Sequence, residues 1–148
     1  MELIKGFEGC SLRAYPDPAT GAEPWTIGYG ATGPGIRPGA VWTQEQAEED
    51  LRKRVIDLAA FIDREINIIL TDEELAALIS FTYNVGKGAF DSSTLRKKIN
   101  AQDIEEAAKE FPRWNKAAGK VLAGLTKRRS AEMAQFLLGA NFKARVEG

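Results

Sequence analysis

Glycine and proline gather in one part of the chain, and this uneven distribution limits the fold more than any other feature. Residues 14–42 contain six of the 14 glycines and five of the six prolines. A helix does not tolerate so many breakers, because proline lacks an N–H donor and glycine loses much backbone entropy on folding. Only the Trp-Thr-Ile-Gly-Tyr stretch at 25–29 is rich in strand-forming residues. We therefore predict a small irregular hairpin or three-stranded sheet.

Outside this stretch, apolar side chains recur at helical spacing. Residues 1–9 predict a short amphipathic helix. Thr43 and Gln46 match a capping box, which predicts a long helix over residues 43–64. Further helices are expected to begin near Thr71, Ser93, Asp103 and Leu125, the last of them ending before Gly139.

These patterns predict an α+β fold with a single domain over residues 1–148. Its parts would be a small β lobe over 1–42, a connecting helix over 43–64 and a larger all-helical lobe over 65–148. A chain of this length buries roughly 68–70% of its unfolded surface, which is enough for one core. We expect a ligand to bind in a cleft between the lobes.

The absence of histidine excludes several classes of site. Of 148 residues none is histidine, which removes Ser-His and Cys-His nucleophiles, histidine general bases and the usual zinc sites. Cys10 is the single cysteine, so the chain has no intrachain disulfide and no CxxC motif. Any chemistry must come from carboxylates, hydroxyls, amides, lysine or arginine.

Charge and hydropathy bear on partners and location. Residues 111–148 hold eight basic and two acidic side chains, with the densest run at 127–129. This excess suits a polyanionic partner or forms a solvated helical face. No aromatic-interleaved basic motif accompanies the run at 127–129, so we expect no nucleic acid. No apolar stretch approaches the ~20 residues of a membrane span, and no signal peptide is visible. The abrupt start leaves open an N-terminal membrane anchor in a longer parent.

Two carboxylates near the N-terminus could cooperate in hydrolysing a glycosidic bond. That reaction needs one protonated carboxyl group to protonate the leaving oxygen and one ionised group to activate water or attack the sugar. Glu8 has apolar neighbours that favour the protonated form, whereas Asp17 lies in a polar Pro-Asp-Pro turn. Thr26 lies in the predicted strand, where its hydroxyl could hold a water molecule. Judged by spacing alone, the pattern is weak evidence, because a glutamate at a helix end and an aspartate in a turn are also common in proteins without such a site.

The amino-acid sequence around these residues resembles the active-site signature of bacteriophage lysozymes, the endolysins of glycoside hydrolase family 24. The resemblance lies in the blocks Leu-Ile-Lys-Gly-Phe-Glu-Gly at 3–9, Ala-Tyr-Pro-Asp at 14–17 and Trp-Thr-Ile-Gly-Tyr-Gly at 25–30. It continues through residues 80–86, 93–95 and 113–129 in the same order. The resemblance implies a lysozyme-like fold over nearly the whole chain.

The resemblance also implies an activity and site residues. Glu8 would be the general acid, Asp17 the carboxylate that steers the attacking water, and Thr26 the hydroxyl that fixes it. The family cleaves the β-1,4 bond between N-acetylmuramic acid and N-acetylglucosamine in peptidoglycan, generally with inversion and with neither metal nor cofactor. Three residues of the helical part would line the glycan groove: Tyr83, Asn84 and Thr94.

The same resemblance implies an endolysin whose partner is the peptidoglycan glycan strand, and we expect a monomer. The enzyme would collect in the host cytoplasm before lysis and then act on the periplasmic wall, without a stable membrane partner in this chain. Two departures stand out: Ala31 replaces the family's usual histidine, and the loop from Asp17 to Thr26 is about three residues longer. In the family that histidine is generally a structural partner, so its loss is expected to alter local stability or the response to pH more than the chemistry.

Two other functions fit part of this pattern. A lysozyme-like module that binds wall glycan without cutting it would need none of Glu8, Asp17 and Thr26. A lytic transglycosylase of the same fold would yield an anhydro product and would need no residues to manage water. The presence of Asp17 and Thr26 favours hydrolysis.

Overall fold

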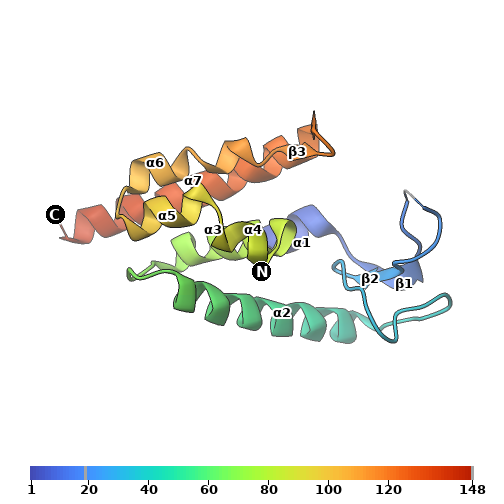
Figure 1. Cartoon of the computed structure of the whole chain (residues 1–148). Coiled ribbons are helices and arrows are strands. Elements are labelled where there is room, and N and C mark those ends of the chain that lie inside the picture. The colour runs from blue at the N-terminus through green and yellow to red at the C-terminus, as the bar shows by residue number, and fades with distance from the viewer. Residues whose placement is uncertain (19, 148) are drawn as a thin grey trace. The chain divides into compact units, whose positions relative to one another are not determined.

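The computed structural model describes residues 1–18 and 20–147, with side chains as far as Lys143. The chain divides into two compact units, Met1–Ile56 and Asp57–Gly148. Figure 1 shows the order of the elements along the chain. Helix α2, Gln44–Glu65, contributes residues to both units.

The first unit combines a short helix with a small sheet. Helix α1 spans Glu2–Glu8, and strands β1 (Ser11–Tyr15) and β2 (Thr26–Gly28) pair antiparallel (Figure 1). Ser11 lies opposite Gly28 and Tyr15 opposite Thr26, with an irregularity between the two pairs. Isolated bridges from Arg13 to Val41 and from Ile27 to Ala31 extend this hairpin. The predicted small irregular hairpin is confirmed.

A compact apolar cluster supports the hairpin. Its buried members are Ala14, Ile27 and Ala31, and Trp42 is among the side chains that pack against them. Gly28 has a φ of 64°, and a Cβ atom there would lie 2.8 Å from Cζ3 of Trp42. Glycine is therefore required at this position both by its backbone conformation and by the aromatic ring against it.

Helix α2 begins where the capping box predicts. The Thr43 hydroxyl accepts a hydrogen bond from the Gln46 N–H (3.1 Å), and the Gln46 side chain accepts one from the Thr43 N–H (2.7 Å). These two bonds satisfy donors that the first turn of a helix leaves unpaired. A stripe of apolar residues on α2 is buried: Ala47, Leu51, Leu58 and Ile62.

The second unit is mainly helical. Its elements are α3 (Asp72–Val85), α4 (Lys87–Asp91), α5 (Thr94–Asn100), α6 (Ile104–Ala108), η1 (Phe111–Arg113), β3 (Lys116–Ala117), β4 (Lys120–Val121) and α7 (Ala123–Glu147). The small hairpin of β3 and β4 was not predicted from the sequence. It turns at Ala118 and Gly119, which both have positive φ, and its two-residue strands are too short to show an alternating pattern.

Aromatic rings and one close helix contact form the core of the second unit. Phe81 packs edge-on against Phe90 and Phe111, and all three rings are fully buried. Helix α7 packs against α3. The predicted end of this last helix before Gly139 is wrong, because α7 continues to Glu147 and Gly139 is a buried contact with the start of α3.

No helix in the part of the chain that the structure describes combines the length and the apolar character that a membrane crossing requires.

Candidate active site

Glu8 is the last residue of α1. Ile4 anchors this helix in the core with 1% of its surface exposed, and Gly9 ends the helix with a φ of 65°. The Glu8 side chain is half-buried. Its carboxylate lies against Gly30, since a Cβ atom at Gly30 would be 3.3 Å from Oε2 of Glu8. The turn after β2 therefore borders the candidate acid directly.

Asp17 anchors the loop that follows β1. Its N–H donates to the Ala22 carbonyl oxygen (2.9 Å), and its carbonyl oxygen accepts from the N–H groups of Gly21 (2.7 Å) and Thr20 (3.2 Å). The Thr20 hydroxyl also bonds within the loop, accepting from the Ala22 N–H (3.2 Å). These bonds hold the longer loop in a compact form around the Asp17 backbone.

Thr26 is the first residue of β2, and the hairpin register links it to Asp17. Thr26 lies opposite Tyr15, two residues before Asp17. Gly30, which borders Glu8, follows the same strand β2 by two residues. One hairpin and one helix end thus carry all three candidate residues within the first unit.

The three predicted glycan-contacting residues belong to the second unit. Tyr83 and Asn84 lie in the last turn of α3, and Thr94 is the first residue of α5. Tyr83 is half-buried, whereas Asn84 and Thr94 are exposed. Helix α5 begins here because the Ser93 hydroxyl caps it, accepting from the Arg96 N–H at 3.1 Å.

The structure places Ala31 and Glu23 in contrasting settings. Ala31, at the position of the expected histidine, is 4% exposed and belongs to the apolar cluster beneath the hairpin. Glu23 is exposed in the loop between Asp17 and Thr26. Among the described residues, no group of three or more Cys, Asp or Glu side chains is placed to hold a metal ion.

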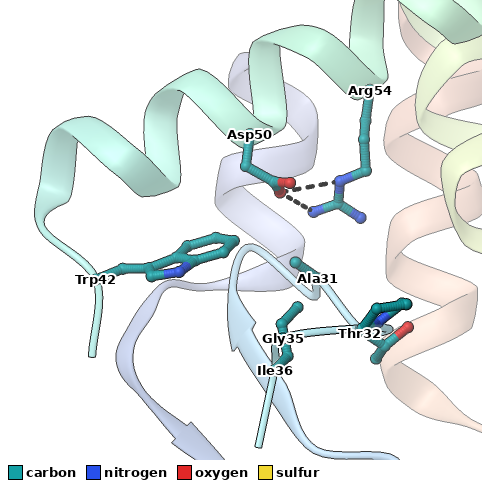
Figure 2. A pocket seen from close by; sticks show the side chains of 8 residues that line it. Ala31, Thr32, Gly35, Ile36, Trp42, Asp50 and Arg54 are labelled. Carbon is teal, nitrogen blue, oxygen red and sulfur yellow. Dashed lines mark hydrogen bonds and ion pairs between the residues drawn. The ribbon is translucent and has the colours of Figure 1, made fainter. Parts of the chain in front are cut away.

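A hollow of about 510 Å³ in the first unit lies beside this hairpin (Figure 2). Trp42, Asp50 and Arg54 form part of its lining, and the rest comes from Ala31, Thr32, Pro34, Gly35 and Ile36. Arg54 donates a hydrogen bond from Nε to Oδ2 of Asp50 (3.0 Å), and its Nη2 lies 2.9 Å from the same oxygen as an ion pair. Nη2 also donates to the Tyr29 carbonyl oxygen (3.2 Å). None of the three candidate catalytic residues lines this hollow.

Sequence reasoning missed a polar network that surrounds Tyr29. Nζ of Lys5 lies 2.6 Å from Oε2 of Glu48, and the Tyr29 hydroxyl donates to Oε1 of Glu48 at 3.1 Å. The hydrogen bond between Lys5 and Glu48 lowers the pKa of Glu48 and raises the pKa of Lys5. Burial raises the pKa of the Tyr29 hydroxyl. Lys5 and Glu48 are 43 positions apart, so no local pattern could have paired them.

The basic run at 127–129 is mostly internal. Arg128 and Arg129 are 4% and 0% exposed, and both bond to the fully buried Glu132. Oε2 of Glu132 also accepts from the Ser80 hydroxyl at 2.5 Å. Nε of Arg129 and Oε1 of Glu132 lie 2.8 Å apart as an ion pair, although their angle is not that of a hydrogen bond. The interpretation of this run as a polyanion-binding surface is therefore wrong for both arginines.

Comparison with known proteins identifies the family. The phage lysozyme family model matches residues 5–132, most of the chain. This chain belongs to the phage lysozyme family. The endolysin of Bacillus phage PZA is 45% identical over 142 residues, which cover 94% of this chain and 54% of that protein. The endolysin of Acyrthosiphon pisum secondary endosymbiont phage 1 is 44% identical, over 92% of this chain and 93% of the relative.

Solved structures agree with this assignment. The muramidase domain of SpmX from Asticaccaulis excentricus has a TM-score of 0.82 at 36% identity, covering 92% of each chain. The endolysin from Escherichia coli O157:H7 phage FAHEc1 has a TM-score of 0.80 at 37% identity, covering 92% of this chain and 89% of that one. The predicted α+β, lysozyme-like fold is confirmed. The chain spans about half the length of some curated relatives, among them the endolysins of Bacillus phages B103 and PZA.

Proposed function

We propose that this member of the phage lysozyme family is a muramidase that acts as an endolysin. It hydrolyses the β-1,4 bond between N-acetylmuramic acid and N-acetylglucosamine in bacterial peptidoglycan. The observation that carries the proposal is the arrangement of the hairpin, whose β2 strand begins at Thr26 beside the Asp17 loop and leads to Gly30 against the Glu8 carboxylate. The names of the similar proteins, endolysin and muramidase domain, support it.

The proposed reaction uses the two carboxyl groups in different roles. Glu8 donates a proton to the glycosidic oxygen as the bond breaks. Asp17 accepts a proton from a water molecule that attacks the anomeric carbon, and the Thr26 hydroxyl orients that water. Attack by water from the face opposite the leaving group inverts the anomeric centre, and it requires carboxyl groups about 6.5–9.5 Å apart. No metal or cofactor takes part in this scheme.

Further parts of the proposal concern the substrate and the route to it. Tyr83, Asn84 and Thr94 contact the glycan, since an aromatic ring with amide and hydroxyl groups suits the apolar and polar sides of a sugar. The two units work as one lysozyme domain, and the enzyme is a monomer. It collects in the host cytoplasm and then acts on the wall. The relative from bacteriophage PS119 is named a SAR-endolysin, so an anchored route through a longer parent is the other option.

The products of digestion test the proposed reaction. Purified peptidoglycan is incubated with the protein in H₂¹⁸O, and the released fragments are analysed by mass spectrometry. Hydrolysis predicts fragments with a reducing N-acetylmuramic acid end that carries one ¹⁸O atom. Anhydro ends without ¹⁸O would instead indicate a lytic transglycosylase. Retention on insoluble wall without any released fragment would indicate a binding module.

A further inference from the structure

We propose that Glu48, together with Lys5 and Tyr29, positions the Glu8 carboxylate for proton donation. This inference rests on the proposed function, in which Glu8 is the general acid. Glu48 is a positioning residue here and not a catalytic one, because it acts through the two segments that border Glu8. Those segments are the end of α1 and the turn after β2.

The first connection fixes α1. Lys5 lies one helical turn before Glu8, and its ammonium group is 2.6 Å from Oε2 of Glu48 on α2. The Lys5 carbonyl oxygen also accepts the Gly9 N–H (3.3 Å), the bond that closes the helix immediately after Glu8. The Lys5 side chain therefore ties the turn of helix that carries Glu8 to α2.

The second connection fixes the turn that Glu8 touches. The buried Tyr29 hydroxyl donates to Oε1 of Glu48 (3.1 Å) and accepts from Nε2 of Gln44 (3.2 Å). Gln44 also donates to Oε1 of Glu48 (2.9 Å), and Arg54 holds the Tyr29 carbonyl oxygen (3.2 Å). Tyr29 is thus held at its side chain and at its backbone, directly before Gly30.

One carboxylate consequently fixes both sides of the contact between Glu8 and Gly30. Oε2 of Glu48 holds the helix and Oε1 holds the turn. Charged groups make these bonds shorter and stronger than neutral ones. The Lys5 ammonium nitrogen also lies 5.9 Å from the centre of the Tyr29 ring, so this group contacts both Glu48 and Tyr29.

Loss of this network would affect the chemical step more than substrate binding. A reacting group that is misplaced by ~1 Å can cost about 100-fold in rate. The bonds described above run from Glu48 to α1 and to the turn after β2, so we expect their loss to act first on the position of Glu8. The expected signature is therefore a lower kcat with little change in KM.

Glu48→Gln is the decisive variant, and Glu49→Gln is its matched control. Glu49 is the next residue on α2 and forms an ion pair with the exposed Arg52 of the same helix (2.8 Å). On solubilised peptidoglycan fragments we expect Glu48→Gln to lower kcat about tenfold, with KM within about twofold. Tyr29→Phe, which keeps the ring and removes the hydroxyl, is expected to lower kcat in the same direction. Glu49→Gln should match the unsubstituted protein.

A second readout does not depend on activity. In ¹H–¹⁵N spectra the Gly30 amide resonance should shift in Glu8→Gln and in Glu48→Gln, but stay in place in Glu49→Gln. If the unsubstituted protein cuts no peptidoglycan, the proposed function fails while this shift still tests the positioning. The inference is overturned if Glu48→Gln keeps both kcat and the Gly30 resonance, or if its only effect is a lower melting temperature. If Glu48→Gln does not fold, Tyr29→Phe decides by the same criteria.

Discussion

Gly30 illustrates how one residue shapes the candidate site. Its φ of 93° is rarely adopted by residues with a side chain, and the space beside its Cα is taken by the Glu8 carboxylate. Glu8, Asp17 and Thr26 all lie within the first 26 residues, so a local motif could indicate them. The contact of Glu8 with Gly30, and the pairing of Lys5 with Glu48, depend on how the chain folds back and could not be predicted.

Gly30→Ala is expected to reduce hydrolysis, because the added methyl group forces the Glu8 carboxylate to move by a few tenths of an ångström. The strained backbone should also cost about 1–3 kcal/mol in the free energy of unfolding. Gly33→Ala is the control, since Gly33 also has a positive φ of 114° but has no heavy atom within 4 Å of the added carbon. Release of reducing ends and urea unfolding compare the two. Equal losses of activity in both variants would contradict the role given to Gly30.

Glu132 provides a test of the buried charges in the second unit. Burial raises the pKa of Glu132 and lowers that of Arg129, while their mutual attraction opposes both shifts. Glu132→Ala leaves two guanidinium groups without this partner, so we expect a loss of ~3–5 kcal/mol in the free energy of unfolding. Glu106→Ala removes an exposed pair with Lys109 (2.9 Å) and should leave the free energy of unfolding almost unchanged. Urea denaturation measures both, and similar losses would count against a structural role for the cluster.

At the level of elements, the predicted bounds of α1 and α2 match the structure within one residue, whereas the predicted end of α7 does not. The capping boxes at Thr43 and Thr71 place the starts of α2 and α3 correctly, because the signal lies within four consecutive residues. The end of α7 was missed because Gly139 has a tertiary role. It allows α7 to approach the capped start of α3, which only the folded structure reveals. Local signals therefore indicate where α2 and α3 begin, whereas the end of α7 depends on its packing against α3.

Gly139→Ala tests this helix contact. The added methyl group would overlap the Thr71 hydroxyl and lie 2.9 Å from the Glu74 backbone nitrogen, within the capping box. We expect a net loss of about 1–3 kcal/mol, despite the better helix propensity of alanine. Gly124→Ala, in the same helix with nothing within 4 Å of the new carbon, should be neutral or stabilising. Thermal unfolding followed by circular dichroism compares the two variants, and a Gly139→Ala protein as stable as Gly124→Ala would refute the close contact.

For the whole molecule, the amino-acid composition correctly limited the candidate catalytic groups, whereas the count of charged residues gave a wrong expectation about the surface. The absence of histidine left carboxylates as the candidate acids and bases, and the chain belongs to a family of lysozymes. The basic C-terminal part suggested an exposed basic face, either solvated or binding a polyanion, yet Arg128 and Arg129 are buried. A count of charges cannot show that the two arginines bind Glu132 and Ser80 inside the second unit.

The response of the whole molecule to acid provides a further prediction. Lys5 lowers the pKa of Glu48 in the folded protein below its ordinary value of 4.5. The ionised carboxylate therefore stabilises the fold fully at a pH above 4.5, and this contribution is lost as the pH falls through the lower pKa of the folded state. The difference in unfolding free energy between the unsubstituted protein and Glu48→Gln should therefore be constant above about pH 5 and shrink below it. Urea titrations from pH 7 to pH 3 measure this difference. A difference that grows on acidification would have the wrong sign.

The release of reducing ends from purified peptidoglycan by Glu8→Gln, beside the unsubstituted protein and Glu2→Gln, tests the central claim most directly. Glu2 is an exposed glutamate in the first turn of the same helix, so it controls for the loss of one acidic side chain. The account predicts that Glu8→Gln folds normally and releases almost no reducing ends, whereas Glu2→Gln matches the unsubstituted protein. A folded Glu8→Gln protein that digests peptidoglycan at the normal rate would contradict it.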